Sequence, residues 1–587
     1  MSEPKKGGCF RQFLLLLLIF CLFLAGIAIG GYIFFSSLSD TVDITDTTYL
    51  KFDCKSLAEY QQSSLFQFGE SSNLFLLRRI MESSMEDTRI KGLVLNLSHL
   101  QMSQVHKEEL VDLLKRFKAK GKKVYAYSNF YGLSQYYLAS FADTIIMPDT
   151  LTSEISFVGY AFSSPYLKKL LDKLGITMQV VHIGKYKSAG ENLYKESMSD
   201  AFRENIQSMI ANLYDHRLRT ICTNRKLDYE AFRARIMDGE LAALAPREAQ
   251  KQGLVDELAY YRQLEKVIDK KADDLNMVNI WNYPVKMHTA KHKVAVIFAE
   301  GEIQVGKSKK SFSPLSLGYT QVLGDETLVK QVENAAENDS IKAIILRVNS
   351  PGGSALASQI MYEAILAADQ KKPVVVSMSE VAGSGGYYIA MGGRLVVAQP
   401  STITGSIGVV GLLPDLKGLY EKAGINMSGF VEGKYADLGA NSRGITEEEE
   451  QFIHDSMIRV YKEFKQRVAK NRGMAMEDVE KLAQGRVYTG LQAKNNNLID
   501  LLGGMDKAIA ETRKLLKIPA DETVYLVKYP KEKGFLEKLQ SFSIGAKSPD
   551  VSETLPVAKE LTATLERCLY YSKHKEPAFL YLGPVFK

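Results

Sequence analysis

The chain has 587 residues, which is too long for a single hydrophobic core and predicts at least two domains. Hydrophobic residues make up 46% and charged residues 24%, as in ordinary globular proteins. The formal net charge is only +6 and the basic residues are spread along the chain, which argues against a nucleic-acid-binding protein, so we expect no nucleic-acid partner.

The N-terminus contains an uncharged apolar run from Phe13 to Phe35. As a helix, this run covers about 30 Å, the thickness of the hydrocarbon core of a bilayer. Basic residues precede the run and acidic residues follow it (Lys5, Lys6 and Arg11; Asp40, Asp43 and Asp46). The positive-inside rule therefore predicts a cytoplasmic N-terminus at 1–12, a transmembrane helix at 13–35 and an exported remainder. A cleaved signal peptide is the alternative, although the run is long and no A-x-A-like site ends it.

A tandem repeat dominates the rest of the chain. Residues 90–98, IKGLVLNLS, resemble residues 341–349, IKAIILRVN, which lie 251 positions further on. To within one residue, the same offset relates three later pairs of segments: 123–128 and 373–378, 132–139 and 383–390, 148–159 and 400–411. In both copies short β-branched runs alternate with amphipathic stretches, a pattern typical of βα units on a largely parallel sheet. We therefore predict an α/β fold of two duplicated domains.

The ends of the two copies set the predicted domain boundaries. Each copy has a long helical region, at 199–219 and 446–469, and then a helix that leads into a short apolar strand. A polar stretch at 281–292 is the predicted linker, which places the two domains at 36–280 and 293–523. Residues 524–587 show no repeat partner, and we expect a C-terminal extension with a strand and helices.

Two glycine-containing loops in the second copy suggest acyl-transfer chemistry. A strand at 343–348 runs into NSPGGS at 349–354, where proline and paired glycines leave backbone N–H groups accessible, as an oxyanion site requires. An ordinary glycine-rich turn is the alternative. A second strand, at 374–378, leads to Ser384, which stands between two glycines where a helix is expected to begin. Such a turn exposes the hydroxyl and directs the helix N-terminus at developing negative charge.

A serine hydroxyl needs a neighbouring base. None of the eight histidines lies between residues 293 and 453, so a histidine base in the second copy would have to be His454, on the polar side of a predicted helix. A buried, neutral lysine can replace histidine. In the first copy, an apolar strand at 180–183 enters a loop that contains Lys185 and Lys187. From the pattern alone, solvation is the expected state of both lysines, because most loop lysines are solvated.

From the apolar run to about residue 520, the chain resembles the long, two-domain form of bacterial signal peptide peptidase A, a family related to the ClpP and crotonase folds. Four motifs carry this resemblance: NSPGGS at 349–354, GSGGYY at 383–388, TGSIG at 404–408 and YKSA at 186–189. The one departure is Gly383, where alanine is commoner. The resemblance implies Ser384 as nucleophile, Lys187 as general base and Ser406 as the hydroxyl that orients the lysine, with Gly353 and Gly385 supplying oxyanion-hole N–H groups.

The resemblance also implies a function. It indicates a serine endopeptidase, without metal or other cofactor, that degrades cleaved signal peptides at the bacterial inner membrane. It further implies a single-pass anchor in the lipid bilayer, catalytic domains on the extracytoplasmic side, and a homo-oligomer, specifically a tetramer. The five cysteines show no C-x-x-C spacing, so no zinc site is expected. The alternatives are a non-peptidase crotonase-like enzyme that holds a thioester enolate, and a catalytically silent membrane scaffold.

The repeat adds a prediction of its own. Ser384 corresponds to Leu133 in the first copy, and the paired glycines of NSPGG correspond to Gln101 and Met102. Conversely, Lys187 corresponds to Ala436 in the second copy. The first copy is therefore not expected to be an independent acyl-transfer site. Since each copy keeps what the other lacks, the sequence predicts one site that both domains share.

Overall fold

The computed structural model describes residues 43–59, 73–269, 275–285, 291–313, 318–519, 522–529 and 578–580. The predicted cytoplasmic N-terminus at 1–12 and transmembrane helix at 13–35 lie outside these ranges. Within them, none of the helices is both long enough and apolar enough to cross a bilayer.

The first copy is built on a six-stranded parallel sheet in the order β8-β5-β3-β2-β1-β9. Its central strands are apolar and buried because helices cover them, which parallel sheets require. The strands are β1 (Thr48–Asp53), β2 (Ile90–Asn96), β3 (Lys123–Tyr127), β5 (Thr144–Met147), β8 (Glu257–Leu258) and β9 (Asn276–Asn279). The main helices between them are α2 (Leu74–Glu86), α3 (Gln104–Ala119), α4 (Leu133–Ala139), α9 (Pro246–Lys251) and α10 (Leu264–Ile268), and a small parallel pair is formed by β4 (Phe130–Gly132) and β6 (Glu154–Ser156).

The second copy repeats this plan on an eight-stranded sheet. Six strands lie in the order β21-β17-β16-β14-β10-β22, all parallel, and β18 and β20 extend the sheet beside β16. The strands are β10 (His292–Glu300), β14 (Ile341–Ser350), β16 (Val374–Gly383), β17 (Leu395–Ala398), β18 (Ile403–Gly405), β20 (Val487–Thr489), β21 (Leu501–Leu502) and β22 (Val524–Tyr529). The helices are α11 (Asp325–Glu337), α12 (Ala355–Lys371), α13 (Gly385–Ala390), α17 (Gly490–Asn495) and α18 (Met505–Leu515).

The strand orders of the two sheets correspond position by position, which supports the predicted duplication. The correspondence includes β9 and β22, which pair in parallel with β1 and β10 at equivalent edges. The sequence-based prediction that the second domain ends at 523, without a repeat partner beyond it, is therefore wrong for β22. Edge strands are half-solvated and tolerate divergent residues, and NMVN of β9 shares almost nothing with VYLVKY of β22. The helices expected after β22 fall outside the described residues.

The predicted linker at 281–292 belongs in part to the first core. After the 3₁₀ turn Ile280–Asn282, Trp281 packs edge-on against Phe52 with ring centroids 5.8 Å apart. Tyr283 is buried and its hydroxyl donates to Asp87 Oδ2 at 3.0 Å. Aromatic burial therefore extends the first domain to at least residue 283, and β10 of the second begins at His292.

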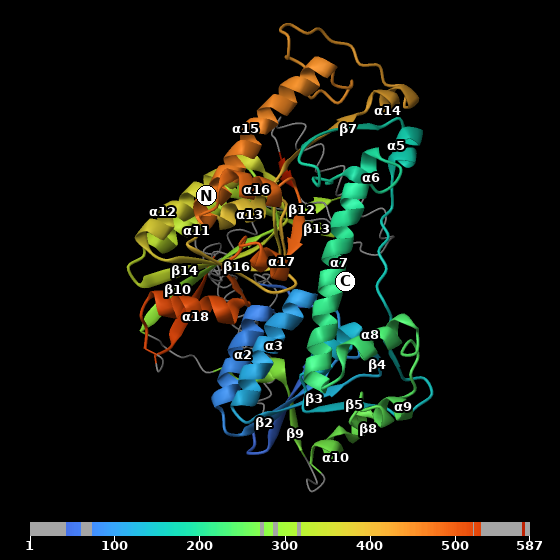
Figure 1. Cartoon of the computed structure of the whole chain (residues 1–587). Coiled ribbons are helices and arrows are strands. Elements are labelled where there is room, and N and C mark those ends of the chain that lie inside the picture. Colours follow the sequence, from blue (N-terminus) through green and yellow to red (C-terminus); the bar gives the residue numbers. More distant parts are fainter. Residues whose placement is uncertain are drawn as a thin grey trace, which may run out of the picture.

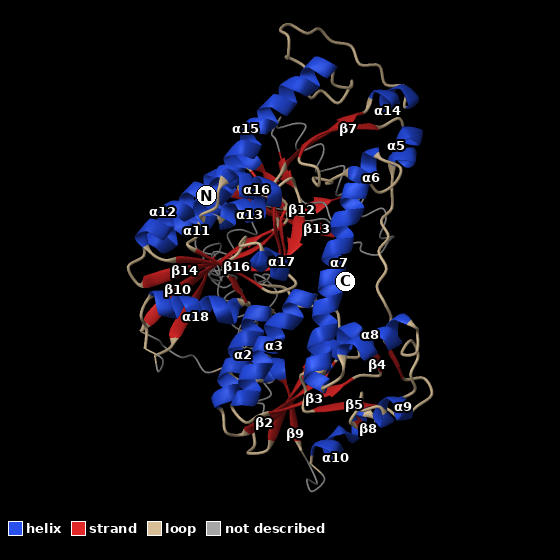
Figure 2. Ribbon diagram, in the orientation of Figure 1, coloured by secondary structure: helices blue, strands red, loops and turns tan. Residues whose placement is uncertain are grey.

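Helices α2 and α3 form a layer that both sheets share (Figure 1). Phe75 of α2 contacts Phe298 of β10 at 6.1 Å between ring centroids, and α18 lies beside the same layer (Figure 2). Arg347 of β14 is fully buried and reaches across to Glu59 and Glu109 of the first copy, with nitrogen–oxygen distances of 2.9 Å to each. The two domains therefore meet through both apolar and ionic contacts.

An arm of the first copy extends away from its own sheet to the far end of the second copy (Figure 1). It comprises α5 (Lys168–Leu174), β7 (Thr177–Ile183) and α6 (Glu191–Tyr194). Strand β7 pairs antiparallel with β19 (Val409–Asp415) along its whole length, from Thr177 opposite Asp415 to Ile183 opposite Val409. Helix α14 (Lys417–Lys422) lies beside α5, where Gly175 and Gly418 approach so closely that a side chain on Gly175 would clash. The arm is what brings first-copy residues to the second copy.

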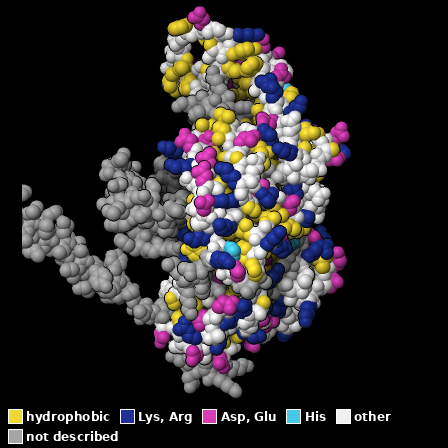
Figure 3. Space-filling model, turned by 90° about the vertical axis from the view of Figure 1, so that its left-hand side faces the viewer, with side chains coloured by type: hydrophobic (Ala, Val, Ile, Leu, Met, Phe, Trp, Pro, Cys, Tyr) yellow, Lys and Arg dark blue, Asp and Glu magenta, His cyan; other side chains and the backbone are white. Residues whose placement is uncertain are grey.

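The β7–β19 pair closes a mixed third sheet in the order β12-β13-β11-β15-β23-β19-β7. Its other strands are β11 (Glu302–Gln304), β12 (Lys309–Ser313), β13 (Gly318–Gly324), β15 (Gly352–Ser354) and β23 (Ala578–Leu580). The predicted long helical regions are α7 (Asp200–Arg225) and α15 (Glu447–Arg472), followed by α8 (Tyr229–Met237) and α16 (Met476–Leu482). Ser199 and Thr446 cap the long helices, as Ser and Thr commonly do. On the face seen in Figure 3, basic and acidic side chains are interspersed.

Candidate active site

Ser384 occupies the sharp turn between β16 and α13. Its backbone has φ 53° and ψ −116°, a conformation that residues other than glycine rarely adopt. The turn is held on both sides, because Ser384 N donates to Gly405 O at 2.9 Å and Tyr388 N donates to Ser384 O at 2.8 Å. Backbone strain of this kind is common at functional sites, where it orients a reactive side chain.

Lys187 follows β7 and enters the second copy beside the loop that precedes β20. Tyr186 N donates to Gln484 O at 2.7 Å, and Lys185 N donates to Gln484 Oε1 at 2.9 Å. A side chain on Gly485 would come within 2.5 Å of Lys187 Cβ, so only glycine allows this approach. Two backbone segments that lie far apart in sequence therefore hold the lysine in place.

The structure brings three of the predicted residues together. Lys187 Nζ lies 2.8 Å from Ser384 Oγ, 3.0 Å from Ser406 Oγ and 3.0 Å from the Ser406 carbonyl oxygen. A neutral amine has two N–H donors and one lone pair. The carbonyl oxygen can only accept, so one N–H points to it, the other can reach Ser406 Oγ, and the lone pair can accept the Ser384 hydroxyl proton. A neutral amine can therefore satisfy all three contacts, and so can an ammonium group with its three N–H donors.

The surroundings of Lys187 favour this uncharged form. The side chain is 2% exposed, and burial lowers its pKa well below the ordinary lysine value. Among the described residues, no carboxylate forms an ion pair with Lys187 to oppose this effect. Ser384 and Ser406 are buried as well, so the whole cluster is shielded from bulk water.

Gly353 and Gly385 lie next to each other beside Ser384. A side chain on Gly385 would come within 3.3 Å of Gly353 N, and one on Gly353 would lie 2.0 Å from Ile303 O. Gly353 has φ 151°, a value that favours glycine. The NSPGGS loop and the GSGGYY turn are therefore adjacent in space, and the absence of side chains at both glycines allows this close packing.

The C-terminal strand β23 lies next to this loop. It pairs antiparallel with β15, placing Phe579 opposite Gly353, and antiparallel with β19, placing Ala578 opposite Val410. Strand β11 is bordered by β13 on one side and β15 on the other, so both of its edges are paired. The extended segment β23 therefore occupies the slot between β15 and β19.

The other candidate positions lie elsewhere. His454 is on α15, where its closest recorded charged partner is Asp455 at 3.9 Å, and within the described ranges Lys187 provides the one side-chain nitrogen bonded to Ser384 Oγ. Leu133 is buried at the start of α4, and Ala436 lies exposed in a loop. Lys185 is largely exposed and faces Glu204 at 3.8 Å.

Sequence reasoning missed the residues that position Lys187. Gln484 and Gly485 stand almost three hundred positions after the lysine, and both have positive φ values. Neither belongs to a recognisable motif, so only their backbone contacts with residues 184–187 reveal the role. A glycine just before a short strand was the one available signal, and it is too common to be specific.

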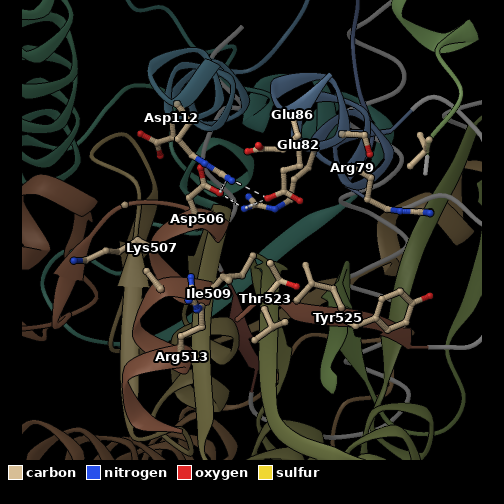
Figure 4. Close-up of a pocket in the computed structure, with 18 of the residues that line it drawn as sticks. Arg79, Glu82, Glu86, Asp112, Asp506, Lys507, Ile509, Arg513, Thr523 and Tyr525 are labelled. Atoms are coloured by element: carbon tan, nitrogen blue, oxygen red, sulfur yellow. Dashed lines mark hydrogen bonds and ion pairs between the residues drawn. The ribbon is translucent and has the colours of Figure 1, made fainter. Parts of the chain in front are cut away.

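A cavity of about 870 Å³ lies away from this cluster, between α2 and α3 of the first copy and α18 and β22 of the second. Figure 4 shows Asp506, Lys507 and Arg513 of α18 on one side and Glu82 and Asp112 on the other. Asp506 bonds to Arg78 and, at 2.9 Å, to Arg116. These ion pairs bridge the two copies, and none of the lining residues belongs to the serine–lysine cluster.

Comparisons with known proteins identify the family of the chain. The profile of peptidase family S49 matches residues 116–275 and 367–519, one block in each copy and more than half of the chain in all. Serine protease SPPA, chloroplastic, of Arabidopsis thaliana is 34% identical over 495 residues, covering 81% of this chain and 71% of that protein. Protease 4 of Salmonella typhi is 33% identical over 471 residues, with 77% and 74% covered. A putative signal peptide peptidase SppA of Enterococcus faecium is 34% identical over 238 residues, 38% of this chain and 69% of that protein.

Proposed function

Since the chain belongs to peptidase family S49 and is a serine peptidase of the two-domain SppA type, we propose that it hydrolyses peptides with Ser384 as nucleophile and Lys187 as general base. The observation that carries the proposal is the 2.8 Å contact between Lys187 Nζ and Ser384 Oγ in a buried site. Family membership alone assigns no residue, whereas this contact supports one specific pair.

The first chemical step is acylation. The neutral Lys187 amine takes the Ser384 proton while Oγ attacks the peptide carbonyl carbon. An ordinary lysine with a pKa of about 10.4 would be only about 0.04% neutral at pH 7, so burial is what makes the base available. Ser406 keeps the amine directed at Ser384 through its carbonyl and hydroxyl oxygens. The protonated amine then gives its proton to the departing amine of the substrate.

The second step is hydrolysis of the ester on Ser384. Lys187, again neutral, takes a proton from water while the water oxygen attacks the ester carbonyl carbon. The bond from that carbon to Ser384 Oγ then breaks, and Oγ regains its proton from Lys187. In both steps, negative charge develops on the carbonyl oxygen. We assign the Gly353 and Gly385 N–H groups to this oxygen because the two glycines are adjacent to Ser384 and to each other. One such donor is typically worth about 10²–10³ in rate.

The slot between β15 and β19 is the proposed binding place of the substrate backbone. A peptide in extended form would pair with these strands as β23 does, bringing its carbonyl group near Gly353. Backbone pairing of this type selects for unfolded segments and tolerates many side chains. Released apolar signal peptides, the substrate class that the name of the Enterococcus relative suggests, meet this description.

The cellular setting is part of the proposal. The apolar run at 13–35 would anchor the protein in the bacterial inner membrane as a single-pass helix, with both catalytic domains on the extracytoplasmic side. Such an anchor would keep the site near membrane-bound peptides. Cysteine accessibility labelling of the two sides of the membrane in intact cells tests it, and a reactive site on the cytoplasmic side after residue 40 would contradict it.

A second copy of the chain is the proposed protein partner, in the tetramer that family resemblance implies. Within the chain, β7 pairs with β19, but their repeat counterparts, residues 426–432 and 157–163, do not pair. Phe430 is 96% and Met427 63% exposed, while Val158 and Tyr160 are about half exposed. Pairing these segments between chains would repeat the β7–β19 contact and cover the apolar side chains. A Met427→Asp/Phe430→Asp variant should dissociate in sedimentation velocity, whereas the exposed control Leu151→Asp should not.

A serine-directed fluorophosphonate probe tests the catalytic assignment. We expect labelling of Ser384 in the wild-type chain and at least a hundredfold slower labelling in Lys187→Met, which keeps the length of the side chain but removes the amine. Lys185→Met, two residues away and exposed, is the matched control and should label normally. Equal labelling in Lys187→Met and wild type would exclude the lysine as base. Loss of peptide hydrolysis in both lysine variants would instead indicate a damaged loop.

A further inference from the structure

A second buried lysine contacts a serine in the first copy. Lys107 lies on α3, and its Nζ donates to Ser134 Oγ on α4 at 2.6 Å. The lysine is 3% exposed, whereas Ser134 is partly exposed. The pair therefore joins a buried lysine to a partly exposed serine, at the turn of the first copy that corresponds to the Ser384 turn.

The repeat relates this pair to a contact in the second copy. Ser134 corresponds to Gly385, one position after the nucleophile, and Lys107 corresponds to Ser358. These counterparts also face each other, because a side chain placed on Gly385 would lie 2.6 Å from Ser358 Oγ. In both copies, this contact joins a helix, α3 in the first and α12 in the second, to the turn at the start of the next helix. Only the first copy equips it with an amine and a hydroxyl.

The environment of Lys107 resembles that of Lys187. Burial, and then the nearby Arg217 guanidinium, lower the pKa of Lys107 well below the ordinary value, as burial does for Lys187. Within the described ranges, no ion pair joins Lys107 to a carboxylate. Its neighbour Glu108 accepts a hydrogen bond from Ser401 Oγ at 2.6 Å and lies 3.4 Å from His216 Nε2. Glu108 is thus occupied at the domain interface, and the serine hydroxyl is the partner of the amine.

From this geometry we propose that Ser134 is a second nucleophilic serine, activated by Lys107, that accepts an acyl or phosphonyl group from an activated electrophile. The Ser134 oxygen forms a bond to the carbonyl carbon or phosphorus while its proton passes to Lys107 Nζ. The bond to the leaving group breaks, and that group departs with the electron pair. The reaction needs no other reactant and does not involve Ser384.

The first copy lacks the features that would make this serine a hydrolase. Gln101 and Met102 stand where the second copy has the glycines of NSPGG. Without those accessible N–H groups, the developing oxyanion loses donors that are typically worth about 10²–10³ in rate each. Attack by water on the resulting ester needs the same stabilisation. We therefore expect slow acceptance and retention of the group without turnover, which revises the sequence-based expectation that the first copy is not an independent acyl-transfer site.

The test uses the full chain with Ser384→Ala, so that the main nucleophile is absent, and a fluorophosphonate probe, from which fluoride is the leaving group. Mass spectrometry of the peptide containing Ser134 should find the phosphonyl adduct, forming about 10²–10³ times more slowly than the Ser384 adduct of the wild-type chain. Adding Lys107→Met should abolish the adduct. Adding Lys115→Met, an exposed lysine on the same helix, should leave it unchanged.

Folding of the Lys107→Met protein is checked independently. In a chain that keeps Ser384, Lys107→Met should still allow normal labelling of Ser384, which requires both domains to be intact. Ser384→Ala is incubated with the probe a thousand times longer than is needed to label wild-type Ser384 completely. The absence of any Ser134 adduct after that time overturns the proposal. An adduct that persists in Lys107→Met overturns it too, because Ser134 would then react without the lysine.

Discussion

The two copies of the repeat share a sheet order but differ at the same strand-to-helix turn. In the second copy, β16 ends in Gly383-Ser384-Gly385 beside the NSPGGS loop, and Ser384 adopts a strained backbone. In the first copy, β4 leads into α4 with Leu133 at the matching position, buried in the core. The scaffold was therefore kept while the chemistry of one turn changed. This difference indicates that apolar strands determine the fold of this chain, whereas a few loop residues determine its proposed activity.

The lysine shows the opposite asymmetry. The first copy extends β7 onto the second, which carries Lys187 to Ser384, whereas the corresponding loop of the second copy has Ala436 and lies exposed. In the proposed mechanism, one copy thus supplies the base and the other the nucleophile. A single site needs both domains, and the following variants test how completely the copies have diverged.

Exchanging the nucleophile between the copies should have the largest effect. Ser384→Ala should lower kcat/KM for peptide hydrolysis by at least about 10³-fold, because the attacking hydroxyl is lost. Adding Leu133→Ser should restore nothing, since the first copy has no glycine pair at the corresponding loop. Recovery of more than about a tenth of the wild-type rate would mean that the two turns are still interchangeable. A thermal melt of each variant serves as the folding control, because Leu133 is a core residue.

The next comparison concerns the seventh residue of β2 and of β14, where Asn96 corresponds to Arg347. Arg347→Met should destabilise the chain by about 3–5 kcal/mol in chemical denaturation, because Glu59 and Glu109 are left buried without their cation. Asn96→Ala removes a surface hydrogen bond to Asp53 and should cost about 0.5 kcal/mol.

The pH dependence of stability sharpens this second test. Burial raises the pKa of Glu59, but Arg347 and then His106 outweigh this effect and lower the pKa to about 2. A carboxyl whose pKa is lower in the folded state stabilises the fold above its unfolded pKa and loses that contribution as the pH falls toward 2. The wild-type chain should therefore lose stability below about pH 4.5, and Arg347→Met should lose less over this range. An equal loss in both proteins would indicate that Arg347 does not set the charge state of Glu59.

A smaller effect is expected from pH on catalysis. Lys187 acts as the neutral base, so kcat/KM should rise about tenfold per pH unit below the pKa of Lys187 and then level off. Burial lowers that pKa, so the plateau should begin well below the ordinary lysine value of about 10.4. Lys185→Met, which removes an exposed lysine of the same loop, should leave the inflection in place. An inflection at the value of a free lysine would contradict the buried amine.

The smallest predicted change involves β23, which occupies the slot of the second copy. Deleting residues 576–587 should raise kcat/KM for an extended peptide by about three- to tenfold, since the edges of β15 and β19 no longer pair with the chain itself. A small ester, which needs no strand pairing, should be hydrolysed at an unchanged rate and is the control. A lower rate with the peptide would mean that β23 supports the site instead of competing for it.

Much of the fold could be predicted because it depends on local patterns. The apolar runs of β2 and β14 and the amphipathic stretches of α3 and α12 gave the duplicated α/β plan, and the glycines around Ser384 identified the turn. Edge strands were harder. β22 was assigned to an extension because it resembles β9 only in its pairing, and Trp281 and Tyr283 were assigned to a linker although both pack on the first core.

The positions of Gln484 and Gly485 could not be predicted at all. Their contribution is a close backbone approach to Lys187, and no periodicity or motif records such a contact. The same holds for the Lys107–Ser134 pair, whose two residues belong to different elements and carry no shared pattern. Contacts between distant segments depend on how the packed layers meet, which single-sequence patterns do not encode.

The amino-acid sequence by itself determined that the chain is a duplicated α/β protein, that Ser384 stands at a sharp turn, and that neither copy holds both Ser384 and Lys187. Only the tertiary structure decided that β7 crosses to β19, that Lys187 Nζ lies 2.8 Å from Ser384 Oγ, and that this amine is shielded from water. The physical reason is that a lysine's protonation state depends on burial. Burial is a property of the packed neighbours, and these come from segments hundreds of residues apart.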